Sequence, residues 1–109
     1  MATDLDLLRG TLDMLVLKAL LWGPRHGYAV TEWIHQTSKD ELAVEDGALY
    51  GALHRLAARG FLAAEWGLSE HNRKAKYYSL TAKGRRELRA REVTWARYAR
   101  AVDRIVSTA

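Results

Sequence analysis

The sequence predicts one mainly helical domain that contains a small β-hairpin and continues into a long C-terminal helix. Three observations predict this fold class. Apolar residues recur with helical spacing over most of residues 11–60, residues 61–80 change to a period of two, and residues 82–106 return to a helical pattern that no proline interrupts. With 109 residues, of which 49% are hydrophobic, the chain can bury one core but is too short for two ordinary domains.

The first 40 residues predict an arm and two short helices. Residues 1–10 hold leucines without a firm period, which indicates a partly ordered arm. Thr11 is a suitable N-cap for the first helix, and the pair Gly23-Pro24 ends it. Apolar residues recur with helical spacing at Leu12, Leu15, Val16, Ala19 and Leu20. The second helix opens at His26. Four of its residues are expected to face the core: Ala29, Val30, Trp33 and Ile34. We interpret His26 as a partner of backbone NH groups at the helix start rather than as a ligand.

The stretch from Ala43 to Gly60 predicts a third helix with one packed side and one free side. Helical spacing places on the packed side Leu49, Ala52, Leu53, Leu56 and Gly60. It places on the free side Gly47, Tyr50, Gly51, His54, Arg55 and Ala58. Glu45 or Asp46 can accept from the first backbone NH groups, and Gly60 supplies a left-handed residue at the end. The free side combines small residues with hydrogen-bonding side chains, as base edges and phosphates require, although a solvated surface helix explains the same pattern.

Residues 61–80 predict a two-stranded hairpin, because apolar residues there recur at every second position. A polar segment separates the two strands, and Arg73, Lys74 and Lys76 place three cations on or beside it. A solvated basic turn would have the same composition. Directly after a helix with a free donor face, however, a basic hairpin is typical of a wing that reaches phosphates or a neighbouring minor groove.

Residues 82–106 predict a helix of roughly 40 Å, with Thr81 as its cap. Its apolar stripe, with nearly heptad spacing, comprises Leu88, Trp95, Tyr98, Ala99, Val102, Ile105 and Val106. A helix folded back on its own domain would also explain the stripe, but the first three helices already have mutual partners. We therefore expect residues 1–80 to form a winged helix-turn-helix domain and residues 81–109 to form a homodimerisation helix of the same compact unit.

Composition excludes several classes of protein. The chain has no cysteine, so disulfides, thiolate zinc sites and cysteine nucleophiles are excluded. No stretch approaches about 20 apolar residues and no signal pattern opens the chain, which predicts a cytoplasmic protein that binds no membrane. The histidines lie on different elements without ligand spacing, and no nucleophile or phosphate-loop motif appears, so we expect no enzyme, metal or cofactor. The net charge of +4 is concentrated in residues 61–109.

Four segments, in order and at matching separations, resemble the PadR family of bacterial transcriptional regulators. They are GTLDMLVL at residues 10–17, GPRHGY at 23–28, GALYGALHRL at 47–56 and RKAKYYSLT at 73–81. The resemblance implies a winged helix-turn-helix homodimer, usually a repressor, of the short type with one C-terminal dimerisation helix. It also implies that DNA is contacted by the third helix through Gly47, Tyr50, Gly51, His54 and Arg55, and by the wing through Arg73, Lys74 and Lys76.

Two residues depart from the family pattern. Ala48 stands where the family usually has Ser or Thr, and a lost hydroxyl cap typically costs about 1 kcal/mol. Gly51 stands where Pro is usual and loosens the helix start by up to roughly 1 kcal/mol relative to alanine. We expect both to change sequence preference without abolishing binding. Some relatives bind aromatic effectors at the dimer centre, which makes Trp95 a candidate effector residue, although a tryptophan on an apolar stripe more often only packs.

These observations predict a sequence-specific DNA-binding regulator. We expect a repressor that occupies a near-palindromic site as a homodimer. Its partners would be double-stranded DNA, a second copy of the chain and a small aromatic effector. The alternative is a winged-helix module that binds another protein, and strong salt dependence of binding to random DNA would separate the two.

Overall fold

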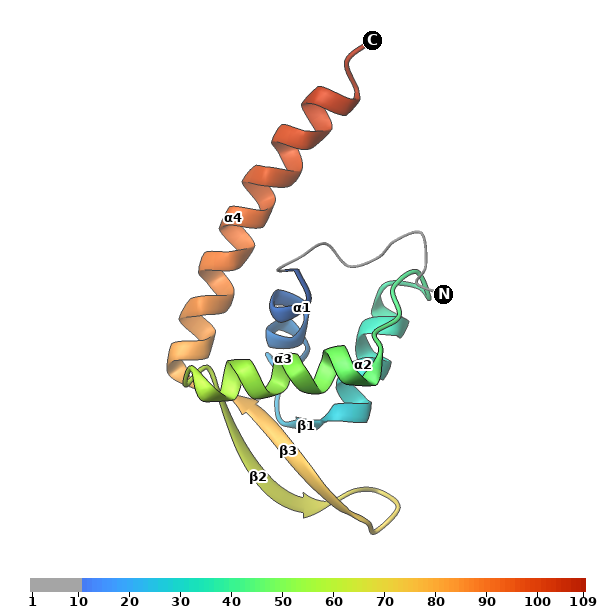
Figure 1. The fold of residues 1–109 in the computed structure, drawn as a ribbon, viewed down its shortest axis with the longest axis vertical. Coiled ribbons are helices and arrows are strands. Elements are labelled where there is room, and N and C mark those ends of the chain that lie inside the picture. Colours follow the sequence, from blue (N-terminus) through green and yellow to red (C-terminus); the bar gives the residue numbers. More distant parts are fainter. Residues whose placement is uncertain (1–10) are drawn as a thin grey trace.

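Three short helices and a small antiparallel sheet form the body of the protein, and a long helix leaves it (Figure 1). The computed structural model describes residues 11–109, so the expected N-terminal arm lies outside the described residues. In chain order the elements are α1 (Thr11–Ala19), β1 (Arg25–His26), α2 (Gly27–Thr37), α3 (Asp46–Ala58), β2 (Leu62–Leu68), β3 (Lys74–Leu80) and α4 (Ala82–Val106). The predicted fold class, mainly helical with a small sheet and a long last helix, is confirmed.

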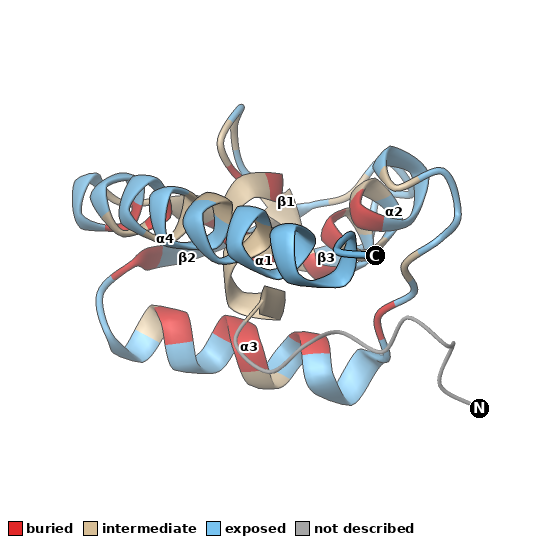
Figure 2. Cartoon of the chain, turned by 90° about the horizontal axis from the view of Figure 1, so that it is seen from above, coloured by how far each residue is buried: buried red, intermediate tan, exposed pale blue. Residues whose placement is uncertain are grey.

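One apolar core joins the helices to the sheet. Its largest fully buried side chains are Val16, Leu17, Leu20, Val30, Leu49, Leu53, Leu56 and Leu88. Burying each such side chain contributes about 1.5–3 kcal/mol relative to leaving it in water. Figure 2 shows the buried residues of α3 along the side that faces the rest of the body, and the opposite side is exposed. The core therefore holds α3 by one side and leaves the other side accessible.

The sheet has three strands, where the sequence predicted a two-stranded hairpin. The hairpin itself forms as expected from β2 and β3, and its outermost pairs are Leu62 with Leu80 and Leu68 with Lys74. β1 adds to the other edge of β3, where Arg25 pairs with Tyr78 and His26 pairs with Tyr77. Two residues are too few to show a period, so only the neighbouring strand reveals β1. This pairing fixes the start of α2 against the hairpin.

The predicted caps form at two helix starts and fail at a third. His26 caps α2, because its Nδ1 accepts from the backbone N of Ala29 at 3.1 Å. Thr81 caps α4, because its Oγ1 accepts from the backbone N of Gly84 at 3.0 Å. At α3 the expected side-chain cap is wrong, since the N-cap residue Glu45 makes no side-chain cap hydrogen bond. Backbone bonds and the packed inner side therefore hold the start of α3 without a capping side chain.

The sequence predicted the end of α3 correctly but not the end of α1. α3 ends where predicted, with Gly60 in the left-handed region at a φ of 82°. α1 ends at Ala19, several residues before the Gly23-Pro24 pair that the sequence offered as its stop. There Nε of Arg25 donates to the carbonyl oxygen of Ala19 at 2.9 Å and satisfies one of the free carbonyls at the helix end. Arg25 of β1 thus caps the C-terminal end of α1.

The first half of α4 belongs to the body of the domain. Lys18 of α1 pairs with Glu92 at 2.8 Å. Leu88, which the sequence placed in the dimer stripe, is instead 2% exposed in the core of its own protomer. Gly84 lies so close to the chain before β2 that an added Cβ would overlap the carbonyl oxygen of Phe61. These contacts hold α4 at its base, while its second half projects beyond the body (Figure 1).

We expect Gly84→Ala to destabilise the fold. Alanine is the better helix former by roughly 1 kcal/mol, but its Cβ has no room against the Phe61 backbone. Overpacking of this kind typically costs about 1–3 kcal/mol, because a backbone segment must move. Urea unfolding followed by circular dichroism measures the loss.

Gly51→Ala is the matched control within another helix. The added Cβ would lie 3.4 Å from Nη1 of Arg55, which is the end of a flexible side chain and can move. This variant should gain up to roughly 1 kcal/mol of stability from helix propensity. A stabilised Gly84→Ala variant would contradict the close approach of α4 to the chain before β2.

Candidate nucleic-acid interface

The free side of α3 is flat in its middle and carries larger side chains at its edges. An added Cβ at Gly47 would meet nothing within 4 Å, so this position faces open space. Tyr50 lies toward the hairpin and is 46% exposed. Arg55 lies at the opposite edge, toward α1. The small residues between these edges let another surface approach the helix backbone closely.

A groove with a volume of about 640 Å³ separates α3 from the hairpin and from the start of α2. The predicted DNA-contacting residues that line it are Tyr50, His54, Arg73, Lys74 and Lys76. Gly47, Gly51 and Arg55 do not line it. Two turns of helix and the hairpin thus bring permanent cations and hydrogen-bonding groups to one concave surface. Such a surface attracts phosphates and offers donors to base edges.

Arg55 has a structural partner that the sequence did not indicate. Its Nη2 donates to Oδ1 of Asp13 at 2.8 Å, and Arg91 of α4 approaches the other carboxylate oxygen at 4.0 Å. Asp13 is largely buried, with 16% of its side chain exposed, so the cations compensate a carboxylate that is partly removed from water. This ion pair links α3 to α1, and the Arg55 side chain remains 59% exposed, so its contact with DNA stays a prediction.

Tyr50 is positioned by contact with a glycine. A Cβ at Gly27 would lie 2.7 Å from the hydroxyl oxygen of Tyr50 and 2.9 Å from its ring. Only glycine at position 27 therefore lets the ring lie against the start of α2. Behind it, burial and then the neighbouring Tyr50 raise the pKa of the Tyr78 hydroxyl. Both phenols line the groove.

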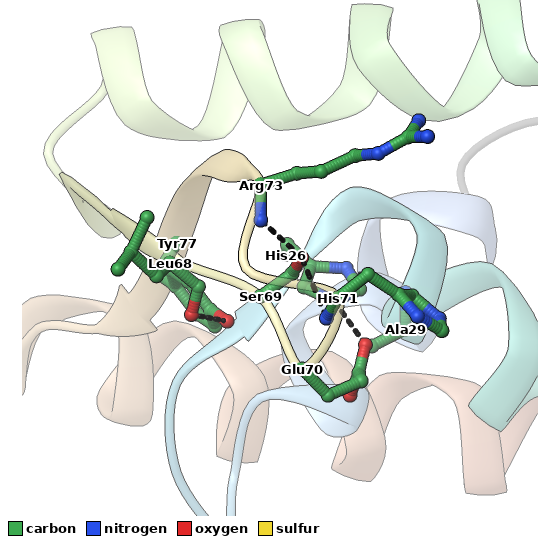
Figure 3. Close-up of polar contacts among 8 residues, drawn as sticks. All are labelled: His26, Ala29, Leu68, Ser69, Glu70, His71, Arg73 and Tyr77. Atoms are coloured by element: carbon green, nitrogen blue, oxygen red, sulfur yellow. Dashed lines mark hydrogen bonds and ion pairs between the residues drawn. The ribbon is translucent and has the colours of Figure 1, made fainter.

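The turn of the wing is organised by one serine. Oγ of Ser69 accepts from the backbone N of His71 and from that of Arg73, each at 3.3 Å. The hydroxyl of Tyr77 donates to the carbonyl oxygen of Leu68 at 2.8 Å and ties β3 to the end of β2. Figure 3 shows that the side chains of Arg73 and Glu70 leave this turn in different directions. The turn therefore presents a cation on one side and a carboxylate on the other.

Sequence reasoning missed several residues of the groove. Trp66 is 62% exposed and has the Nζ of Lys74 at 5.7 Å from its ring centroid. It lies opposite Lys76 in the hairpin, and this register puts both side chains on one face. Tyr28 and His26 add aromatic rings from the start of α2. The alternating pattern of the hairpin contained Trp66, but only the register showed which face meets α3.

The second half of α4 exposes the predicted apolar stripe. Ile105 and Val106 are 75% and 76% exposed, and the rings of Trp95 and Tyr98 lie 6.0 Å apart. Val93, on the opposite face of the helix, is also exposed. Within residues 11–109, no cluster of side chains could hold a metal ion, and no helix is both long and apolar enough to cross a membrane.

Comparison with known proteins gives consistent matches. The model of the transcriptional regulator PadR-like family matches residues 16–90. A PadR family transcriptional regulator from Eggerthella lenta DSM 2243 is 35% identical, with a TM-score of 0.76 over 93% of this chain and 86% of that chain. A transcriptional regulator from Clostridium thermocellum is 24% identical, with a TM-score of 0.84 over 94% of this chain and 99% of that chain. An uncharacterised protein X of Lysinibacillus sphaericus is 28% identical over 98 residues, which is 90% of each chain.

Proposed function

The chain belongs to the transcriptional regulator PadR-like family and is a DNA-binding regulator, and from this premise we propose that it represses transcription as a homodimer on a near-palindromic operator. The observation that carries the proposal is the groove in which the free side of α3 meets the cations of the wing. Because a regulator of transcription acts on the chromosome, we also place its action in the cytoplasm.

Each protomer would lay α3 in the major groove and its wing on the flanking backbone. The small residues Gly47 and Gly51 allow α3 to approach base edges, and His54 projects a ring that donates or accepts hydrogen bonds there. Arg73 and Lys74 extend from the wing, where phosphates are within reach of a side chain. Affinity then comes mainly from charge, and sequence preference from α3.

The proposed dimer uses the stripe on the projecting half of α4. Leu88 no longer belongs to the stripe, because it is buried in its own protomer. The stripe consists of Trp95, Tyr98, Ala99, Val102, Ile105 and Val106. An exposed apolar stripe of this length is unusual on a monomer and marks a surface that associates. A twofold dimer also supplies two copies of α3 for a symmetric site.

Trp95 is the proposed effector contact in that dimer. Its ring lies at 6.0 Å from Tyr98, so the pair offers aromatic surface on the stripe. A variant in which Trp95 is the only tryptophan should change its fluorescence when planar aromatic compounds are added. An unchanged spectrum at saturating compound would remove the effector from the proposal.

The proposed function is tested by selecting bound fragments from random DNA with the purified protein. We expect two similar half-sites whose centres are about 10 base pairs apart, or a multiple of that spacing. His54→Ala should then relax discrimination at particular bases by about 1–3 kcal/mol. Arg55→Ala should relax discrimination likewise and should also lower stability, because Arg55 pairs with Asp13. Selection of unrelated fragments by the wild-type protein would contradict the proposal.

A further inference from the structure

Among the described residues that line the groove, Glu70 is the one acidic side chain. It stands at the tip of the wing, where Arg73, Lys74 and Lys76 supply positive charge. A carboxylate at this place opposes the binding of any polyanion. The turn does not require it, because Ser69 and the backbone organise the turn. The position of Glu70 therefore calls for a role other than turn formation.

Glu70 faces the imidazole of His26. Its Oε1 lies 3.6 Å from Nε2 of His26, across the gap between the wing and the start of α2 (Figure 3). Nδ1 of the same ring accepts from the backbone N of Ala29, so the neutral imidazole carries its hydrogen on Nε2. The ring is held by an edge contact with Tyr77 at 5.4 Å, and 14% of the His26 side chain is exposed. The Nε2 of a largely buried ring thus lies near a carboxylate that is 74% exposed.

Building on the proposed function, we propose that Glu70 is an internal competitor for DNA phosphate in this groove and that His26 is the donor for which the two compete. A phosphate oxygen carries the same sign of charge as the carboxylate and accepts from the same N–H. In the free protein Glu70 occupies His26 and joins the wing to α2. When DNA enters, a phosphate replaces the carboxylate at Nε2, and Glu70 turns into solvent. The contact lowers affinity for all DNA sequences alike.

The test compares two wing variants with the same change in net charge. Glu70→Gln removes the competitor, whereas Glu65→Gln removes a carboxylate that lies on the opposite face of β2 from Trp66 and does not line the groove. Fluorescence anisotropy with labelled random duplexes measures both in the full chain. Glu70→Gln should bind roughly three- to tenfold tighter than the wild type, the effect of one charge several ångströms from a phosphate. Glu65→Gln should gain less than about twofold, because its charge is screened.

A variant at position 26, combined with Glu70→Gln, tests the part played by His26. His26→Asn keeps a good N-cap acceptor for Ala29 and lacks the ring nitrogen that reaches Glu70. In this background the gain from Glu70→Gln should be smaller than in the wild type, because only the direct repulsion between Glu70 and phosphate remains. Amide hydrogen exchange of residues 69–73 without DNA should be faster in both His26→Asn and Glu70→Gln than in the wild type.

The outcomes separate the inference from the proposed function. Equal gains for Glu70→Gln and Glu65→Gln, with normal DNA binding by the wild type, would overturn the inference alone. A full gain from Glu70→Gln in the His26→Asn background would overturn it as well, because the competition would not pass through His26. A wild-type protein that binds no DNA at low salt would remove the proposed function and this inference together.

Discussion

Raising the salt concentration from 50 to 200 mM should weaken DNA binding by roughly three to five orders of magnitude, if the dimer contacts about 6 to 10 phosphates. Each contact releases a condensed counterion, so the logarithm of the association constant falls linearly with the logarithm of the salt concentration. The groove supplies the charge, because three of its lining residues are permanent cations contributed by the wing. Anisotropy titrations with random duplexes over this range measure the slope.

Single charge deletions locate the contacts. Arg73→Ala should reduce the magnitude of the slope by about 1 and weaken all sequences alike. Arg104→Ala is the matched control, because it deletes the same charge from the exposed end of α4. It should leave the slope unchanged. A flat salt response in the wild type would instead favour a module that binds a protein partner.

Val102→Asp combined with Ile105→Asp should convert the protein to a monomer. The two positions lie on the exposed stripe of α4, and burying an unpaired carboxylate between two protomers costs several kcal/mol. We therefore expect dimerisation to weaken by at least about 100-fold. Operator affinity should fall by about two to four orders of magnitude as well, since each α3 would then bind its half-site alone. Analytical ultracentrifugation and mobility shifts measure the two effects.

Val93→Asp is the control for this experiment. Val93 is exposed on the opposite face of the same helix, so the variant adds a charge without touching the stripe. It should remain dimeric and bind the operator normally. A monomeric wild-type protein at micromolar concentration would contradict the dimer, and so would dissociation by Val93→Asp alone.

Local signals in the sequence were sufficient for most of the fold. Helical spacing identified all four helices, α1 to α4, and the change to a period of two identified the hairpin. The caps at His26 and Thr81 and the left-handed Gly60 could be predicted because each depends on neighbours within a few residues. At the start of α3 the sequence left two candidate caps open, Glu45 and Asp46, and the N-cap residue Glu45 makes no side-chain cap hydrogen bond.

The candidate site was predictable only in part. The free side of α3 and the cations of the wing were identified separately, because each follows from one element's own pattern. The groove between them was not, since it depends on the register of the hairpin and on how β1 joins β3. Trp66 and His26 became members of the site only through that arrangement.

By itself the sequence determined the four helices, the two strands of the hairpin and the family to which the protein belongs, because periodicity, caps and motifs act over short separations. The tertiary structure alone decided the contacts between distant segments. It paired Arg55 with Asp13, buried Leu88 in the core of its own protomer and placed Glu70 beside His26. The physical reason is that a side chain's partner depends on which elements pack together, and residues far apart in the chain carry no local sign of that packing.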